Sequence, residues 1–306
     1  MKPHPQVAAL LEAAARSSLP TLDKVSAPAA RRLYAERCKT VAPKPPPAQT
    51  RTLLAPGDVP IRSYRPAGVD KSEVLPALVY FHGGGWTIGD LDTHDVLCRE
   101  LANGARCEVF SVEYRLAPEY PFPAAVEDCI AATRFVSRTS KCVAVGGDSA
   151  GANLAAVVAL HARDHAGPAL RFQLLIYPAT DQNLETESLR RNGEGYLLTR
   201  PLMERFRANY LPRAADYADW RASPALARSH AGLPPAFILT AGFDPLRDEG
   251  KQYAELLARA GVQVAYRDYP DMIHGFIVMG GMVDAANAAV AECCAQLRKA
   301  FEKVVA

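Results

Sequence analysis

Runs of apolar and β-branched residues alternate with helical stretches along most of the chain. Seven such runs predict strands, at residues 59–64, 75–81, 107–114, 141–147, 171–178, 236–242 and 262–269. Between them lie stretches with the apolar spacing of helices, such as 123–138, 151–165 and 245–260. Strands that alternate with helices predict β–α–β units and a doubly wound, mostly parallel sheet. The central runs are almost continuously apolar, which is typical of strands covered on both faces.

Two segments depart from this alternation. The first predicts helices at residues 5–18 and 28–40, followed by the proline-rich stretch 43–47, which is typical of a stiff linker. The second, residues 181–230, separates two predicted strands and is far longer than a usual connection. It predicts a helix after Thr199, with one apolar face formed by Leu202, Met203, Phe206 and Tyr210.

Long insertions at the ends of α/β strands often form lids over active sites. We therefore expect N-terminal cap helices in residues 1–48 and a cap insertion at 181–230. The catalytic α/β domain would comprise residues 49–180 and 231–306.

Composition and charge narrow the class of protein. The chain has 306 residues, of which 49% are hydrophobic and 22% charged, as in an average globular protein. Its net charge of +2 argues against nucleic acid as a partner, because phosphate binding needs a strong basic field. No apolar run is long enough to span a membrane. The seven cysteines are scattered without a C-x-x-C motif, which favours reduced thiols in a cytoplasmic protein.

A candidate nucleophile lies in Gly147-Asp148-Ser149-Ala150-Gly151, which matches the pattern G-x-S-x-G. A predicted strand ends directly before it and a predicted helix begins directly after it. A serine on such a sharp turn is exposed above the sheet, and small neighbours let the turn close. A phosphate-binding turn is the alternative, but neither a G-x-G-x-x-G nor a P-loop pattern accompanies the motif.

A second glycine-rich motif, His82-Gly83-Gly84-Gly85-Trp86, follows the strand predicted at 75–81. Consecutive glycines carry a large loss of chain entropy on folding, which is reasonable where backbone N–H groups must approach a ligand closely. In acyl transfer such donors stabilise the oxyanion. A merely flexible loop is the alternative, and His82 itself is interpreted as a loop anchor.

The base and its acid partner are sought by their order along the chain, Ser…Asp/Glu…His. His274 follows the last predicted strand, whereas His230 lies in the insertion. His161 and His165 have the spacing of a metal-binding pair, but we interpret them as a solvated helix end.

Asp244 directly follows the strand predicted at 236–242, which makes it the candidate acid. As an aspartate before a proline it could also be only a helix N-cap. Asp248 is the rival carboxylate, one turn further into the helix.

Five motifs together resemble the hormone-sensitive-lipase-like bacterial carboxylesterases (family IV) of the α/β-hydrolase superfamily. The matching stretches are HGGGW (82–86), YRLAPEYPFPAAVED (114–128), GGDSAGAN (146–153), DPLRDEG (244–250) and MIHGF (272–276). The resemblance implies an α/β fold with a mostly parallel eight-stranded sheet, helices on both faces and a helical cap. It also implies a catalytic triad and an oxyanion hole. The triad maps onto Ser149, Asp244 and His274. The oxyanion donors map onto the backbone N–H groups of Gly84, Gly85 and Ala150, with Gly83 as a further candidate.

The resulting hypothesis is a serine carboxylesterase that hydrolyses short- to medium-chain acyl esters without metal or organic cofactor. An amidase or peptidase on the same scaffold is one alternative. A non-catalytic small-molecule receptor, like the related plant gibberellin receptor, is another, but that receptor lacks the histidine found here at position 274. The resemblance also implies a homodimer. Candidate pocket residues in the insertion are Tyr196, Leu197, Leu198, Leu202 and Phe206.

Overall fold

One mostly parallel sheet forms the centre of the computed structural model, which describes residues 2–140, 142–183 and 185–302. Within these residues eight strands pair in the order β1-β2-β4-β3-β5-β6-β7-β8. Their bounds are Ala48–Ala55 (β1), Val59–Pro66 (β2), Ala77–Phe81 (β3), Glu108–Val112 (β4), Val143–Asp148 (β5), Leu170–Ile176 (β6), Ala236–Phe243 (β7) and Val264–Ile273 (β8). β1 and β2, and β2 and β4, are antiparallel, whereas β4 to β8 are all parallel. The expected doubly wound α/β sheet is thereby confirmed.

All seven predicted strands are present, within a few residues of their predicted ends. The strand predicted at 141–147 starts at a residue outside the described part, and β5 is observed from Val143. β1 has no counterpart among the seven apolar runs. It is an edge strand whose residues are mostly exposed, so its sequence lacks the apolar pattern of the buried strands.

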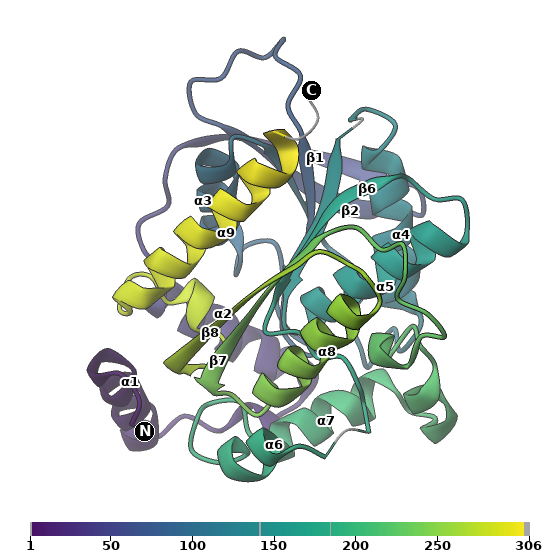
Figure 1. Cartoon of the computed structure of the whole chain (residues 1–306). Helices are drawn as coiled ribbons and strands as arrows, with labels where there is room; N and C mark the ends of the chain where they lie inside the picture. The colour runs from purple at the N-terminus through teal and green to yellow at the C-terminus, as the bar shows by residue number, and fades with distance from the viewer. Residues whose placement is uncertain (1, 141, 184, 303–306) are drawn as a thin grey trace.

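Helices cover both faces of the sheet (Figure 1), with α3 and α9 on one face and α4, α5 and α8 on the other. The helices span Pro5–Arg16 (α1), Ala27–Val41 (α2), Asp95–Ala105 (α3), Ala124–Val136 (α4), Ala150–Asp164 (α5), Glu187–Asn192 (α6), Arg200–Tyr210 (α7), Arg247–Arg259 (α8) and Asp284–Glu302 (α9). α5, which follows the serine motif, is buried along nearly its whole length. Its many alanines and its one glycine, Gly151, allow the helix to pack closely against the sheet.

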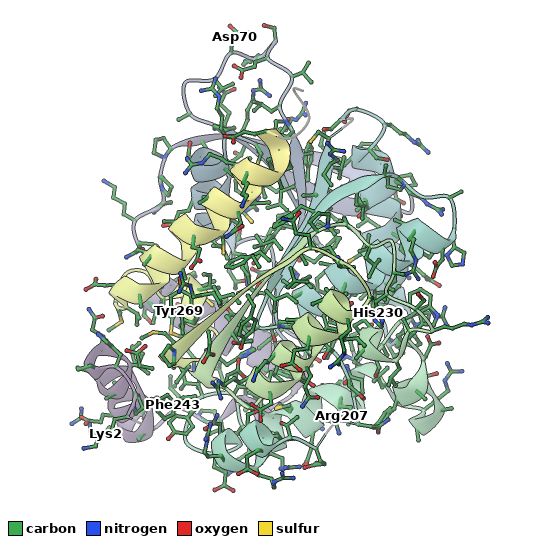
Figure 2. The ribbon with its side chains drawn as sticks, viewed as in Figure 1. Lys2, Asp70, Arg207, His230, Phe243 and Tyr269 are labelled. Carbon is green, nitrogen blue, oxygen red and sulfur yellow. The ribbon has the colours of Figure 1, made fainter. Side chains whose placement is uncertain are left out.

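The remaining helices lie at the carboxyl end of the parallel strands. In Figure 1, α6 and α7 lie beyond the lower end of the sheet, towards which the arrows of β7 and β8 point. Figure 2 places Arg207 of α7 at this end and Asp70, in the β2–β3 connection, at the opposite end. The predicted helix after Thr199 is present as α7, and the Thr199 hydroxyl caps it by accepting the Leu202 amide at 3.4 Å.

The N-terminal segment and the insertion meet in a small apolar cluster. Leu22 and Ala30 come from the N-terminal segment, and Leu202 and Phe206 come from α7. Ile88, which follows the HGGGW motif, completes the cluster. Two segments about 170 residues apart along the chain are therefore held together by this cluster.

Candidate active site

Ser149 occupies the sharp turn between β5 and α5. Its φ of +56° and ψ of −119° are strained for a residue with a side chain. The backbone is held on both sides, because the Ser149 amide donates to the Ile176 carbonyl at 2.8 Å and the Asn153 amide donates to the Ser149 carbonyl at 3.0 Å. At Gly151 a side chain would collide with the backbone carbonyl of Phe81. The small residues of the motif are thus required by the packing of this turn.

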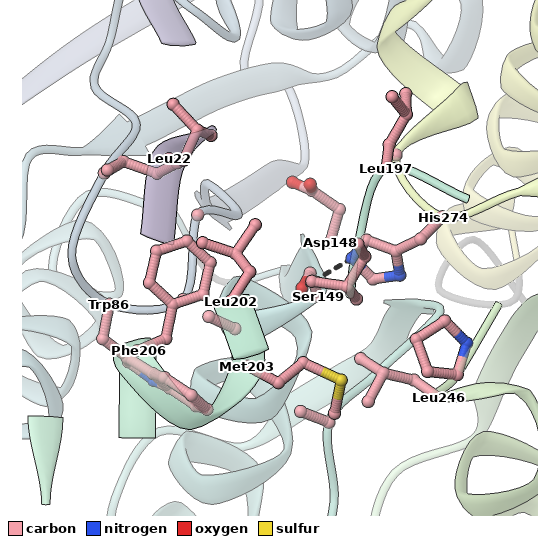
Figure 3. A pocket seen from close by; sticks show the side chains of 18 of the residues that line it. Leu22, Trp86, Asp148, Ser149, Leu197, Leu202, Met203, Phe206, Leu246 and His274 are labelled. Carbon is pink, nitrogen blue, oxygen red and sulfur yellow. Dashed lines mark hydrogen bonds between the residues drawn. The ribbon is translucent and has the colours of Figure 1, made fainter. Parts of the chain in front are cut away.

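His274 lies directly after β8 and meets the serine. Its Nε2 is 2.9 Å from Ser149 Oγ, and its Nδ1 is 2.6 Å from Asp244 Oδ2. The Tyr177 ring packs against the imidazole, with 4.5 Å between the ring centroids. Figure 3 shows the bond between His274 and Ser149 at the floor of a cleft. The structure therefore brings all three predicted triad residues together.

Asp244 makes both of the contacts that its sequence position suggested. Its side chain is completely buried at the end of β7. Oδ1 accepts the Leu246 amide at 2.7 Å at the start of α8, while Oδ2 is paired with His274. The rival Asp248 lies elsewhere, because its Oδ2 accepts the Ser188 amide at 2.8 Å and so binds α6. Of these two carboxylates, only Asp244 contacts the imidazole.

The glycine loop contributes two residues to the lining of the cleft. Gly84 and Gly85 have φ values of +123° and +56°, and a Cβ would collide with the Ile88 carbonyl or with the Phe206 ring, respectively. In the described part of the chain the N–H groups of these two glycines have no acceptor. Both glycines line the cleft, as does Ala150 at the first turn of α5.

Gly83 is a correction to the predicted oxyanion donors. Its amide donates to Asp148 Oδ1 at 3.0 Å, and Gly83 does not line the cleft. An N–H group already committed to a buried carboxylate cannot also bind a developing oxyanion. Gly83 instead ties the loop to the serine motif, a bond that the sequence could not reveal.

A buried polar network lies behind this loop. Asp148 accepts a bond from the Tyr80 hydroxyl at 2.7 Å and pairs with His94 Nε2 at 3.2 Å. Burial alone would raise the pKa of Asp148, but His94 and the Tyr80 hydroxyl hold it below its usual value. His82 stacks on Tyr114, with ring centroids 4.3 Å apart, which agrees with its interpretation as a loop anchor. Burial, and next His94, lower the pKa of His82 to about 4.

Acidification should destabilise the protein through His82. Because its pKa is about 4 when folded and near 6.5 when unfolded, the unfolded state binds the extra proton first as the pH falls. Stability is therefore complete above pH 6.5 and declines towards pH 4, by roughly 2 kcal/mol at pH 5 from His82 alone. Burial lowers the pKa of His161 and His230 in the same direction, whereas Asp148 loses its stabilisation only below its ordinary pKa.

Urea unfolding at pH 7.5 and pH 5 measures this effect. The wild type should lose more stability between the two pH values than His82→Gln, which cannot titrate. An equal loss in both proteins would contradict a neutral, buried His82. The comparison uses the pH-dependent difference, so a general destabilisation of the variant does not affect it.

The cleft above Ser149 has a volume of about 220 Å³. Of the five predicted pocket residues, Leu197, Leu198, Leu202 and Phe206 line it. Tyr196 does not, because its ring packs on Phe243 with 5.1 Å between centroids. Figure 3 shows Leu202 and Phe206 beside Trp86 and Leu22 on one side of the serine. One wall of the cleft is therefore strongly apolar.

Several cleft residues are absent from the sequence-based candidates. Tyr34, Arg37, Cys38 and Val41 reach the cleft from α2, a helix whose sequence pattern shows an apolar face but not what it covers. Glu249, within the DPLRDEG motif, lines the cleft as a buried carboxyl group. Burial raises the pKa of Glu249 well above its usual value. The sequence signal for Glu249 was its position within the DPLRDEG motif, which was used above only to choose the acid partner of the histidine.

His161, His165 and His230 lie outside this site. His161 and His165 stack on each other, with ring centroids 4.3 Å apart, and line a separate shallow surface depression. His230 Nε2 is hydrogen-bonded to the Pro224 carbonyl at 2.9 Å. Among the described residues no three His, Cys, Asp or Glu side chains gather in a way that could hold a metal ion. Within the described part of the chain, no helix has the length and apolar character needed to cross a membrane.

Comparison with known proteins identifies relatives of this chain. Residues 78–278 match the model of a family described as having the alpha/beta hydrolase fold. The chain is 46% identical over 261 residues to the carboxylic ester hydrolase LipN of Mycobacterium tuberculosis, covering 81% of this chain and 69% of LipN. It is also 46% identical over 255 residues to the carboxylesterase NlhH of the same species, covering 80% of this chain and 79% of NlhH.

A solved structure is similar over almost the whole chain. The ester hydrolase EH1AB1 from the metagenome of Lake Arreo, in complex with a bipyridine phosphonate derivative, superposes with a TM-score of 0.93. It is 41% identical, and the match covers 99% of this chain and all of that one. This structural similarity extends over both predicted cap segments as well as the sheet. The chain therefore belongs to the α/β-hydrolase family, as a member of its hormone-sensitive-lipase-like carboxylesterase branch.

Proposed function

We propose that this carboxylesterase works through an acyl-enzyme on Ser149, with His274 as base and Asp244 as its orienting acid. The observation that carries the proposal is the chain of two short contacts, 2.9 Å from Ser149 Oγ to His274 Nε2 and 2.6 Å from His274 Nδ1 to Asp244 Oδ2. Distances in this range permit proton transfer within the bound complex. Asp244 holds the His274 imidazole in one tautomer, because the carboxylate oxygen that faces Nδ1 can only accept a hydrogen bond.

The reaction then follows from the positions of these groups. His274 Nε2 takes the Ser149 proton as Oγ attacks the ester carbonyl carbon. The carbonyl oxygen becomes an oxyanion and is bound by the amides of Gly84, Gly85 and Ala150. His274 passes its proton to the departing alcohol, and water activated by the same imidazole hydrolyses the acyl-enzyme. The positive end of α5 lies beside the developing charge and favours it.

We propose short- to medium-chain acyl esters as substrates. The cleft volume of about 220 Å³ is below the roughly 300–1,000 Å³ of pockets that hold drug-sized ligands. Its apolar wall, formed by Leu22, Trp86, Leu202 and Phe206, suits an alkyl group.

A rate series over p-nitrophenyl esters of increasing acyl length tests this proposal. We expect kcat/KM to be highest for short chains and to fall steeply once the acyl group exceeds the cleft. A stopped-flow burst of about one p-nitrophenol per active site is expected where deacylation is slower than acylation. A matched p-nitroanilide should react at least about 1,000-fold more slowly, since amides need stronger leaving-group protonation. Faster turnover of the anilide would identify an amidase, and no turnover of either would support a receptor.

We further propose that residues 1–48 and 181–230 form a cap over a catalytic domain made of 49–180 and 231–306. Side chains of both segments share one apolar cluster and line the same cleft above the strand ends. This arrangement lets the cap set the shape of the acyl site while the sheet holds the triad.

Cytoplasmic location and a homodimer are also proposed. The seven cysteines are free thiols, as is typical of a reducing compartment. β8 pairs only with β7 among the described residues, so a second copy could extend the sheet across this edge. Cell fractionation and sedimentation equilibrium test the two statements. An extracellular location or a monomer at micromolar concentration would contradict them.

A further inference from the structure

Arg31 of α2 reaches out of the N-terminal segment and binds the loop that carries the glycine motif. Its Nε donates to the Thr87 carbonyl at 2.9 Å, and its Nη2 donates to the Ala117 carbonyl at 2.9 Å. The same guanidinium forms a bidentate pair with Glu119, at 3.0 Å to Oε1 and 2.6 Å to Oε2. One side chain therefore joins three points that belong to two other segments.

Those points are directly connected to Gly84 and Gly85. The Thr87 hydroxyl donates to the Gly85 carbonyl at 3.0 Å, and the Thr87 amide donates to the Gly84 carbonyl at 3.1 Å. The Ala117 amide donates to the Trp86 carbonyl at 2.8 Å. The backbone from Gly84 to Thr87 thus forms a hydrogen-bonded turn. Arg31 holds the Thr87 end of this turn.

The opposite end of the loop is held from inside the molecule. There the Gly83 amide is bonded to buried Asp148, and His82 is stacked on Tyr114. Between the two ends lie Gly84 and Gly85, whose backbones have the greatest conformational freedom in an unfolded chain. Their amides must point at one place before the oxyanion forms, so the loop needs an anchor on each side.

The contacts made by Arg31 require a guanidinium group. Its planar fork can donate in two directions at once, to the Thr87 and Ala117 carbonyls and to the Glu119 carboxylate. A lysine ammonium carries the same charge but cannot span these acceptors in one plane. The Arg31 side chain is 28% exposed and that of Glu119 is 45% exposed, so the ion pair alone contributes little to stability.

We propose that Arg31 is a positioning residue that holds the amides of Gly84 and Gly85 in register with Ser149. Docking of α2 thereby becomes a condition for transition-state stabilisation, beyond its part in forming the cleft. The inference rests on the proposed oxyanion role of these two amides. It makes the N-terminal segment a component of the catalytic machinery through a named side chain.

The test compares Arg31→Met and Arg31→Lys with Arg32→Met, a matched change at the exposed neighbour on the same helix. For Arg31→Met we expect kcat to fall about 10- to 100-fold with KM changed less than about twofold, since only a transition-state interaction is weakened. Affinity for a trifluoromethyl ketone, which forms the oxyanion, should fall by the same factor. Affinity for the matching methyl ketone should stay unchanged. Arg31→Lys should lie between, and Arg32→Met should equal the wild type.

Guanidinium chloride at a non-denaturing concentration should partly restore kcat of Arg31→Met and have no such effect on Arg32→Met. A raised KM with unchanged kcat, or an equal loss of affinity for both ketones, would overturn the proposal. If Arg31→Met does not fold, Arg31→Lys and Glu119→Gln decide it: the first should lose kcat selectively, whereas the second keeps both carbonyl bonds and should stay near wild type. Failure of the triad assignment would appear separately, as wild-type protein that a phosphonate does not label at Ser149.

Discussion

Ser149→Ala should lower kcat for a p-nitrophenyl ester by at least about 10⁴-fold without loss of the fold. The substitution removes only the hydroxyl group, which is hydrogen-bonded to His274. The backbone bonds that hold the turn, from the Ser149 amide to Ile176 and from Asn153 to Ser149, do not involve the side chain. Residual turnover would come from the cleft and its amide donors acting on bound ester.

Steady-state kinetics and thermal unfolding of the same preparation check this prediction. Ser137→Ala, at the half-buried C-cap of α4 and far along the chain from the triad, is the matched control and should keep full activity and a melting temperature close to that of the wild type. Retention of more than about one tenth of wild-type kcat in Ser149→Ala would rule this serine out as the nucleophile.

Asp244→Asn should cost about 10⁴-fold in kcat with a nearly unchanged structure. The amide oxygen of the new side chain can still accept the Leu246 amide, as Oδ1 does now. Its NH₂ group then faces His274 Nδ1, where a carboxylate oxygen now lies. A donor at that place forces the other imidazole tautomer, whose protonated Nε2 cannot accept the Ser149 proton.

The pH profile separates this explanation from a loss of stability. Asp244→Asn should melt close to the wild type, and its kcat should rise at high pH as hydroxide replaces the lost general base. Asp248→Asn is the matched control, because Asp248 binds the Ser188 amide and not the imidazole. We expect it to keep kcat within about threefold and to lose stability modestly. A larger loss in Asp248→Asn than in Asp244→Asn would reverse the assignment of the acid.

The parallel part of the sheet could be predicted because burial on both faces leaves a continuous apolar run in the sequence. β1 could not, since an exposed edge strand carries no such run. α7 was predictable from the capping position of Thr199 and from its one apolar face. What that face packs against depends on the tertiary structure. Leu202 and Phe206 line the cleft, whereas Tyr196, which was predicted to line it as well, packs on Phe243.

The candidate triad was predictable because its members follow strand ends in a fixed order along the chain. Choosing Asp244 over Asp248 needed only their distance from the strand. Gly83 shows where such inference stops. Three consecutive glycines look equivalent in sequence, but one amide is taken by Asp148, and only the folded positions reveal it. Arg31 is a stronger case, because its partners Thr87, Ala117 and Glu119 are more than 50 residues away along the chain.

Reaction with a fluorophosphonate, followed by mass spectrometry, tests the central claim most directly. We predict one phosphonyl group per chain, carried by the tryptic peptide 142–163 on Ser149, with complete loss of esterase activity. Ser149→Ala should take up none, and Asp244→Asn should react much more slowly because its imidazole no longer accepts the proton. An adduct on another residue, or continued ester hydrolysis by fully labelled protein, would contradict the account.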